Sequence, residues 1–190
     1  MVRTLDPSVD NAIATAGLAL LVERGFARLS LEEVARMAGV GKPAIYRRFD
    51  NKAALVADLI SRQLPGLDVP DIGDTRAELQ LAVQRGLPAD GPGYVRLIGG
   101  LIAEHDRHPE LIDAFREKVL LPRRAVVLTV LERGQARGDL RDDIDPEAML
   151  DQMAGSFLAR VFAGLDTGPR WRETALETWW QIFRGKGHTT

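Results

Sequence analysis

The chain has 190 residues, of which 45% are apolar and 27% charged, with 25 basic against 27 acidic side chains and no cysteine. This balance is typical of a globular protein that is large enough to bury a core. The lack of cysteine excludes disulfides, cysteine zinc sites and cysteine nucleophiles. No apolar run approaches the roughly 18 residues of a membrane-spanning helix, and no basic segment leads into an apolar region, so we expect a cytoplasmic protein without membrane contacts.

Apolar residues recur at helical spacing along the chain, whereas the alternation typical of strands is absent, so we predict an all-α fold. Asp6-Pro7 is an acidic cap followed by proline, which favours the start of a helix. Ser30 and Glu33 have the spacing of a capping box, and Asn51 has the character of another helix cap. Together with the glycines at which helices stop, these signals predict four N-terminal helices, near 6–25, 31–38, 42–49 and 52–64.

A loop rich in proline and glycine over 65–73 is followed by further helices, which we expect near 74–86, 92–107, 109–137, 146–165 and 169–184. Pro122 should kink or split the helix in which it lies. Gly99-Gly100 lies inside an apolar helix, where two glycines cost about 2 kcal/mol relative to alanines. We therefore expect close helix packing or a cavity wall at this pair.

The helices 31–38 and 42–49, joined by Gly39-Val40-Gly41, have the arrangement of a helix-turn-helix. Ile45 and Phe49 are four residues apart and are expected to face the core. The segment 36–52 holds five basic residues against Asp50 alone. Such a patch on a near-neutral chain favours nucleic-acid binding, although the same charges also fit an ordinary solvated helix face.

Side chains at the start of such a second helix reach base edges in the major groove, while flanking groups contact phosphates. Arg47 has the donors for a bidentate pair with guanine, and Ala44 is small enough to meet a thymine methyl group. Tyr46 and Lys52 are expected to contact phosphates, as are the amides beside Ser30, which also caps its helix. The predicted DNA-binding residues are Ser30, Lys42, Pro43, Ala44, Tyr46, Arg47, Arg48 and Lys52.

The segment 29–52, preceded by Glu23-Arg-Gly-Phe26, resembles the DNA-binding domain of TetR-type bacterial transcriptional regulators. The family pattern has a glycine–aromatic pair, a serine or threonine, a short helix ending in Ala-Gly-Val, a recognition helix with tyrosine and a second aromatic, and a lysine that opens the next helix. This chain fills these positions, within residues 6–60, with Gly25-Phe26, Ser30, Ala38-Gly39-Val40, Tyr46, Phe49 and Lys52. Pro43 and Gly17 depart from the pattern, because a small residue and alanine are more usual there.

The resemblance implies a three-helix helix-turn-helix DNA-binding domain over residues 1–51 and a helical ligand-binding and dimerisation domain over 52–190. In such proteins the last two long helices form a four-helix bundle with a partner subunit, and the preceding helices enclose an inducer pocket. It therefore implies a ligand-responsive repressor that binds a palindromic double-stranded DNA operator as a homodimer. Trp179 and Trp180 are adjacent on the last helix and point to different sides, so we expect at least one to face a partner.

Several apolar and aromatic side chains of the C-terminal helices are candidates for an effector pocket, which would take an apolar small molecule. The same residues also fit an ordinary core, apart from His105, which would be a polar group of the pocket. The spacing of His105 and His108 matches no metal signature, and we expect neither a metal nor a cofactor. The candidates are Tyr94, Leu97, Ile98, Leu101, His105, Phe115, Val119, Met153 and Phe157.

Two other classes of protein compete with this interpretation. The sequence has no glycine-rich phosphate loop and no nucleophile elbow, and its three histidines form no recognisable catalytic arrangement, so we do not expect an enzyme. A helical dimerisation or interaction module, in which DNA binding is lost or secondary, is the alternative. It requires the basic patch at 36–52 to be incidental.

Overall fold

The computed structural model describes residues 6–64, 66–88 and 91–185, without the side chains of Pro92, Arg96 and Leu97. Within these ranges the chain is helical and has no β-strand, which confirms the predicted all-α class. None of the described helices is both long and apolar enough to cross a membrane. The elements are α1 (Pro7–Arg24), α2 (Leu31–Met37), α3 (Lys42–Tyr46), α4 (Lys52–Gln63), α5 (Thr75–Gly86), α6 (Gly91–Ala103), α7 (Pro109–Phe115), the π-helical turn η1 (Arg116–Leu120), α8 (Leu121–Ala136), α9 (Pro146–Phe162) and α10 (Pro169–Phe183).

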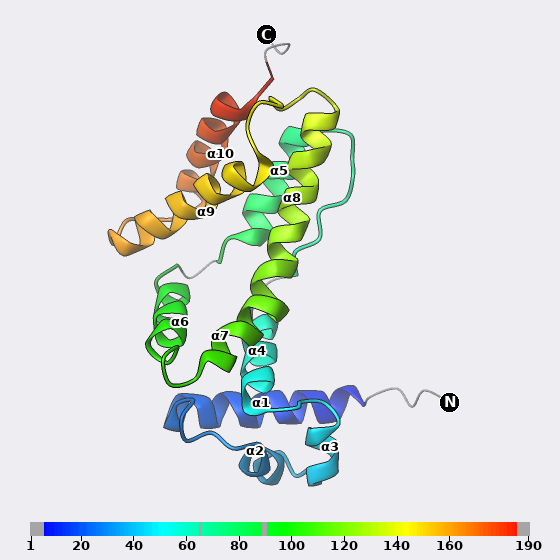
Figure 1. Cartoon of the computed structure of the whole chain (residues 1–190), viewed down its shortest axis with the longest axis vertical. Coiled ribbons are helices and arrows are strands. Elements are labelled where there is room, and N and C mark those ends of the chain that lie inside the picture. The colour runs from blue at the N-terminus through cyan, green and yellow to red at the C-terminus, as the bar shows by residue number, and fades with distance from the viewer. Residues whose placement is uncertain (1–5, 65, 89–90, 186–190) are drawn as a thin grey trace. The chain divides into compact units, whose positions relative to one another are not determined.

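The chain forms two compact units, which we call the head and the body. The head comprises Met1–Gln63 and Glu104–Val119, and the body comprises Leu64–Ala103 and Leu120–Thr190. In the head, α2 and α3 lie beside each other and α2 packs on α1, while α7 packs along α4 (Figure 1). In the body, α8 packs on α5 and α9, α10 packs on α5, and α6 packs on α9.

Local capping fixes the helix starts of the head. The Asp6 carboxylate accepts from the Ser8 amide, and the Ser30 hydroxyl accepts from the Glu33 amide at 3.2 Å. The reciprocal half of the predicted capping box is not formed, because the Glu33 carboxylate instead forms an ion pair with Arg24 from the last turn of α1. A charged guanidinium is a stronger partner for a carboxylate than a neutral amide. The capping-box prediction is therefore confirmed for Ser30 and wrong for Glu33.

The end of α3 and the position of Gly17 are two further details of the head. Helix α3 ends at Tyr46, earlier than predicted, but the Phe49 amide still donates to the Ile45 carbonyl at 3.0 Å and both side chains are buried. Gly17 lies where a Cβ atom would be only 3.0 Å from a methyl group of Leu59. The glycine therefore allows α4 to approach α1 closely, which gives a physical reason for its presence inside a helix.

The predicted split at Pro122 is confirmed. Helix α7 ends at Phe115, η1 follows over Arg116–Leu120, and Pro122 is the second residue of α8. Proline has no amide hydrogen to donate to the carbonyl four residues earlier, and its ring crowds that carbonyl. A wider π-helical turn before the proline accommodates both effects.

The core of the body is built from α5, α8, α9 and α10. Glycine is required at Gly134, where a Cβ atom would lie 2.5 Å from Thr75 Cγ2 and 2.7 Å from Leu140 Cδ1. Gly99 and Gly100 are different, because both are exposed and an added Cβ would meet nothing within 4 Å. The expected close packing at this pair is wrong for the described residues. The buried core includes Leu79, Val83, Val130, Leu131, Leu140, Met149, Met153, Trp179 and Phe183.

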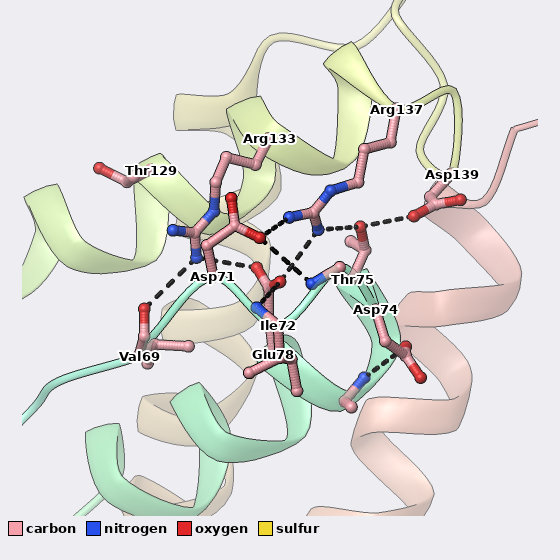
Figure 2. A network of polar contacts seen from close by, with 12 residues as sticks. Val69, Asp71, Ile72, Asp74, Thr75, Glu78, Thr129, Arg133, Arg137 and Asp139 are labelled. Carbon is pink, nitrogen blue, oxygen red and sulfur yellow. Dashed lines mark hydrogen bonds and ion pairs between the residues drawn. The ribbon is translucent and has the colours of Figure 1, made fainter.

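A buried carboxylate connects α5, α8 and the loop before α5 (Figure 2). Glu78 has 0% exposure, and its two oxygens accept from Arg133 at 2.8 Å, from Arg137 at 3.0 Å and from the Ile72 amide at 3.0 Å. The Thr75 hydroxyl donates to Asp139 at 2.7 Å and extends the network to the end of α8. A buried charge is tolerated only when it is paired and hydrogen-bonded, and this network supplies both conditions.

We predict that Glu78→Gln lowers the free energy of unfolding by about 2–4 kcal/mol. This is somewhat below the usual effect of breaking a fully buried ion pair, because both guanidinium groups reach solvent. Glu177→Gln, which breaks the exposed pair with Arg76, should change it by less than about 1 kcal/mol. Urea unfolding measures both. Equal small effects would show that the network contributes little to stability.

The glycines of the body give a second matched test. Gly134→Ala should lower the free energy of unfolding by about 1–3 kcal/mol, because the methyl group overpacks the contact with Thr75 and Leu140. Gly100→Ala should raise it by about 0.5–1 kcal/mol, because the added methyl group meets open space and restricts the unfolded chain. Thermal and urea unfolding of the two variants provide the comparison, and a loss of stability in Gly100→Ala would contradict it.

Candidate nucleic-acid interface

Helix α3 buries one face and exposes the other. Ile45 is fully buried against α2, where Val34 and Ala35 are also buried. The opposite face presents Lys42, Pro43, Tyr46 and Arg47 to solvent. Ala44 is half-buried between the two faces. The structure therefore brings four of the predicted DNA-binding residues together on one exposed surface of the head.

The exposed surface of α3 also holds an acidic partner. The Tyr46 hydroxyl donates to Glu32 Oε1 at 2.6 Å. This hydrogen bond raises the pKa of Tyr46 and lowers the pKa of Glu32, which the nearby charge of Lys42 lowers further. Arg47, by contrast, forms no ion pair with any residue in the described ranges. Lys42 also forms no ion pair in the described ranges, but its charge interacts with that of Glu32, so Arg47, which directly follows α3, is the exposed cation most available to an external acceptor.

Arg48 is placed differently from the prediction. Its side chain is only 7% exposed and forms an ion pair with Asp10 of α1. The same guanidinium donates to the Ala44 carbonyl at 3.0 Å and lies 3.5 Å from the Asp6 carbonyl. Arg48 therefore links the end of α3 to α1 and, in this conformation, does not point outward to a phosphate.

Lys52 also contacts the head itself. Its ammonium group donates to the carbonyls of Phe26 and Ala27, both at 3.1 Å, and lies 4.5 Å from the centroid of the Phe26 ring. The His108 ring meets the same phenylalanine edge to face, with centroids 4.9 Å apart. Lys52 thus satisfies two carbonyls of the turn after α1 and makes a cation–π contact. Ser30 is half-buried and caps α2.

The predicted effector residues are divided between the two units. The head contains His105, Phe115 and Val119, of which His105 is exposed and the other two are buried. The body contains Tyr94, Ile98, Leu101, Met153 and Phe157, while the side chain of Leu97 lies outside the described residues.

Aromatic rings of the body follow one another from α6 through α9 to α10. Tyr94 and Phe157 have ring centroids 6.4 Å apart, Phe157 and Trp171 are 6.1 Å apart, and Trp171 and Trp179 are 6.2 Å apart. Burial raises the pKa of Tyr94, although the charge of Arg123 opposes this shift. Phe157 and Trp179 are buried, whereas Tyr94 and Trp171 are half-buried and offer ring surface to a ligand.

A surface groove of about 840 Å³ opens between α5 and α10. It contains none of the predicted effector residues. Its walls carry charges of both signs, including the pair of Arg76 and Glu177, and its floor includes Val83 and Leu176. The groove is therefore a mixed surface rather than the apolar pocket that the sequence predicts.

Sequence reasoning missed the acidic partners of the basic residues. Asp10 pairs with Arg48, and Glu32 pairs with Tyr46. Glu78 was also missed, although a carboxylate on the buried side of α5 was a usable signal. The contacts of Asp10 and Glu32 link residues 38 and 14 positions apart, so no local pattern identifies them.

A helix-turn-helix with an exposed basic second helix defines a DNA-binding protein of the helix-turn-helix class. The model described as bacterial regulatory proteins of the tetR family matches residues 13–59. The model described as the tetracyclin repressor-like C-terminal domain matches residues 69–178, which is more than half of the chain. The chain belongs to the TetR family of transcriptional regulators.

Relatives over most of the chain agree with this assignment. The HTH-type transcriptional regulator YdeS of Bacillus subtilis (strain 168) is 31% identical over 165 residues, which cover 84% of this chain and 81% of that protein. The DNA-binding transcriptional repressor TetR of Mycobacteroides abscessus is 29% identical over 159 residues, covering 80% and 82%. The crystal structure of the TetR family transcription regulator SCO0332 has a TM-score of 0.62 and 27% identity, covering 91% and 96%.

The contacts of Lys52 within the head give a stability test. Lys52→Ala should lower the free energy of unfolding of the head by about 1–3 kcal/mol, because two carbonyls lose their donor and Phe26 loses its cation. Arg47→Ala should change it by no more than about 0.5 kcal/mol, because its side chain is exposed. Chemical unfolding distinguishes the two, and a Lys52→Ala variant as stable as wild type would contradict the structural role.

Proposed function

We propose that this TetR-family regulator is a ligand-responsive repressor that binds a palindromic operator as a homodimer in the cytoplasm and has no enzymatic activity. The observation that carries the proposal is the outward face of α3, where Lys42, Tyr46 and Arg47 lie together while Ile45 anchors the helix. This arrangement suits insertion into the major groove. The interaction-module alternative gives no reason for cations on that face. The Mycobacteroides abscessus relative, which is named a repressor, supports repression.

An apolar surface on α9 supports the dimer. Gly155, Ala159 and Phe162 follow at helical spacing on its exposed side, and Phe162 is 72% exposed. Exposed apolar surface of this kind is typical of a protein interface. We propose that α9 and α10 pair with the same helices of a second chain, so that two α3 helices reach major grooves about 34 Å apart.

Helix α7 supports a route from ligand to DNA. It packs on α4 in the head, and η1 follows it directly in sequence and leads into α8 of the body. We propose residues 1–51 as the DNA-binding domain and 52–190 as the ligand-binding and dimerisation domain. An apolar effector bound by the body beside Tyr94 and Phe157 would move α7 and α4. To weaken DNA binding 30- to 150-fold, it must favour the DNA-incompetent state by about 2–3 kcal/mol.

Selection from a random duplex library, followed by binding measurements, tests the proposal. Wild-type chain should recover an imperfect palindrome and bind it as two chains per duplex, whereas an interaction module would recover no sequence. Arg47→Ala should cost about 1–3 kcal/mol and relax preference at one base pair of each half-site, because guanidinium pairing with guanine is lost. Lys42→Ala should weaken binding to all sequences and reduce the salt slope by roughly one unit, because one phosphate contact is lost.

A uniform loss across a base-substitution series would instead place Arg47 among the phosphate contacts. Glu132→Ala on α8 of the body serves as a control for a charge change outside the head and should leave the sequence preference unchanged.

A further inference from the structure

An exposed carboxylate of α2 lies beside the outward-facing residues of α3. Glu32 is in the first turn of α2, and its Oε1 accepts from the Tyr46 hydroxyl at 2.6 Å. Both side chains are exposed, so neither burial nor a buried network accounts for the pair. The neighbouring Glu33 is different, because it is half-buried and paired with Arg24. Of these two acids, only Glu32 faces the surface that α3 exposes.

We propose that Glu32 competes with the DNA backbone for the Tyr46 hydroxyl and so limits the affinity of the head for DNA. This inference rests on the proposed DNA-binding role of α3. A tyrosine hydroxyl has one proton to donate, so a hydrogen bond to a phosphate requires that the bond to Glu32 breaks. DNA binding at this position is therefore an exchange of one anionic acceptor for another, with a small net gain.

The charge of Glu32 acts in the same direction. A glutamate carboxylate is ionised at neutral pH in any case. The hydrogen bond from Tyr46 and the nearby charge of Lys42 lower the pKa of Glu32 further, so its charge and that of Lys42 are close enough to interact. A phosphate that approaches Tyr46 meets this negative charge, and the carboxylate offsets part of the attraction from Lys42. The effect is independent of base sequence, because every duplex presents the same phosphates. Glu32 therefore lowers binding to operator and to unrelated DNA alike.

The full chain is measured by fluorescence anisotropy on the selected duplex and on a scrambled duplex of the same length. Glu32→Ala should tighten binding to both by about 5- to 15-fold, because a hydrogen bond to a charged group no longer has to be broken. The salt slope should steepen by up to about one unit, because Lys42 is no longer offset. Glu32→Gln, which keeps an acceptor without the charge, should give a smaller gain. Glu132→Ala, which removes an exposed acid of α8 in the body, should change the affinity for neither duplex.

Tyr46→Phe distinguishes competition for the Tyr46 hydroxyl from the simple loss of the Glu32 charge. In the wild-type background it should change the dissociation constant by less than about twofold, because the hydroxyl is already committed to Glu32. In the Glu32→Ala background it should remove most of the gain. An equal gain with and without the hydroxyl would overturn the competition, and so would unchanged affinity in Glu32→Ala. If wild type selects no DNA, the proposed function fails first and this inference with it.

A titration without DNA tests the pair itself. The chain has two tyrosines, so a Tyr94→Phe background reports Tyr46 alone. Glu32→Ala should lower the pKa of Tyr46, because the carboxylate stabilises the protonated phenol. An unchanged tyrosine titration would show that the pair does not form in solution and would overturn the proposal.

Discussion

The orientation of α3 is the constraint on which the DNA-facing surface depends. A helix of five residues is too short to be stable by itself, so its direction comes from packing rather than from its own hydrogen bonds. Burial of Ile45, the ion pair of Arg48 with Asp10 and the contact of Lys52 with the turn after α1 all act on the segment around it. The side chains that take no part in these contacts, such as Lys42, Tyr46 and Arg47, face solvent.

Local signals predict much of the fold, because their partners are close in sequence. The caps at Asp6, Ser30 and Asn51 and the split at Pro122 involve atoms within a few residues of one another. The site is predicted less completely. Pattern and charge identify α3, but they cannot separate the exposed Arg47 from Arg48, since the inward position of Arg48 depends on its ion pair with Asp10, 38 residues away.

In the body, too, the sequence does not identify partners that are distant along the chain. Helical spacing identifies apolar faces but not what they meet, and the predicted effector residues are therefore found in both compact units. The sequence predicts close contact at Gly99 and Gly100, yet a side chain added at either would meet open space. Gly134 carries no such sequence signal, although Thr75 and Leu140 enclose it. Whether a position requires glycine depends on its tertiary contacts, and neither composition nor residue spacing reveals these contacts.

The division of α3 into a buried and an exposed side has a consequence for how the protein varies. Substitutions at Lys42, Pro43 and Arg47 alter the surface presented to a groove while leaving Ile45 in its place. The energetic coupling between these exposed positions and the core is small, because substitutions far from packed contacts are nearly neutral for stability. Sequence preference for DNA is therefore free to diverge between related chains by a few point changes, while the architecture of the head is inherited intact.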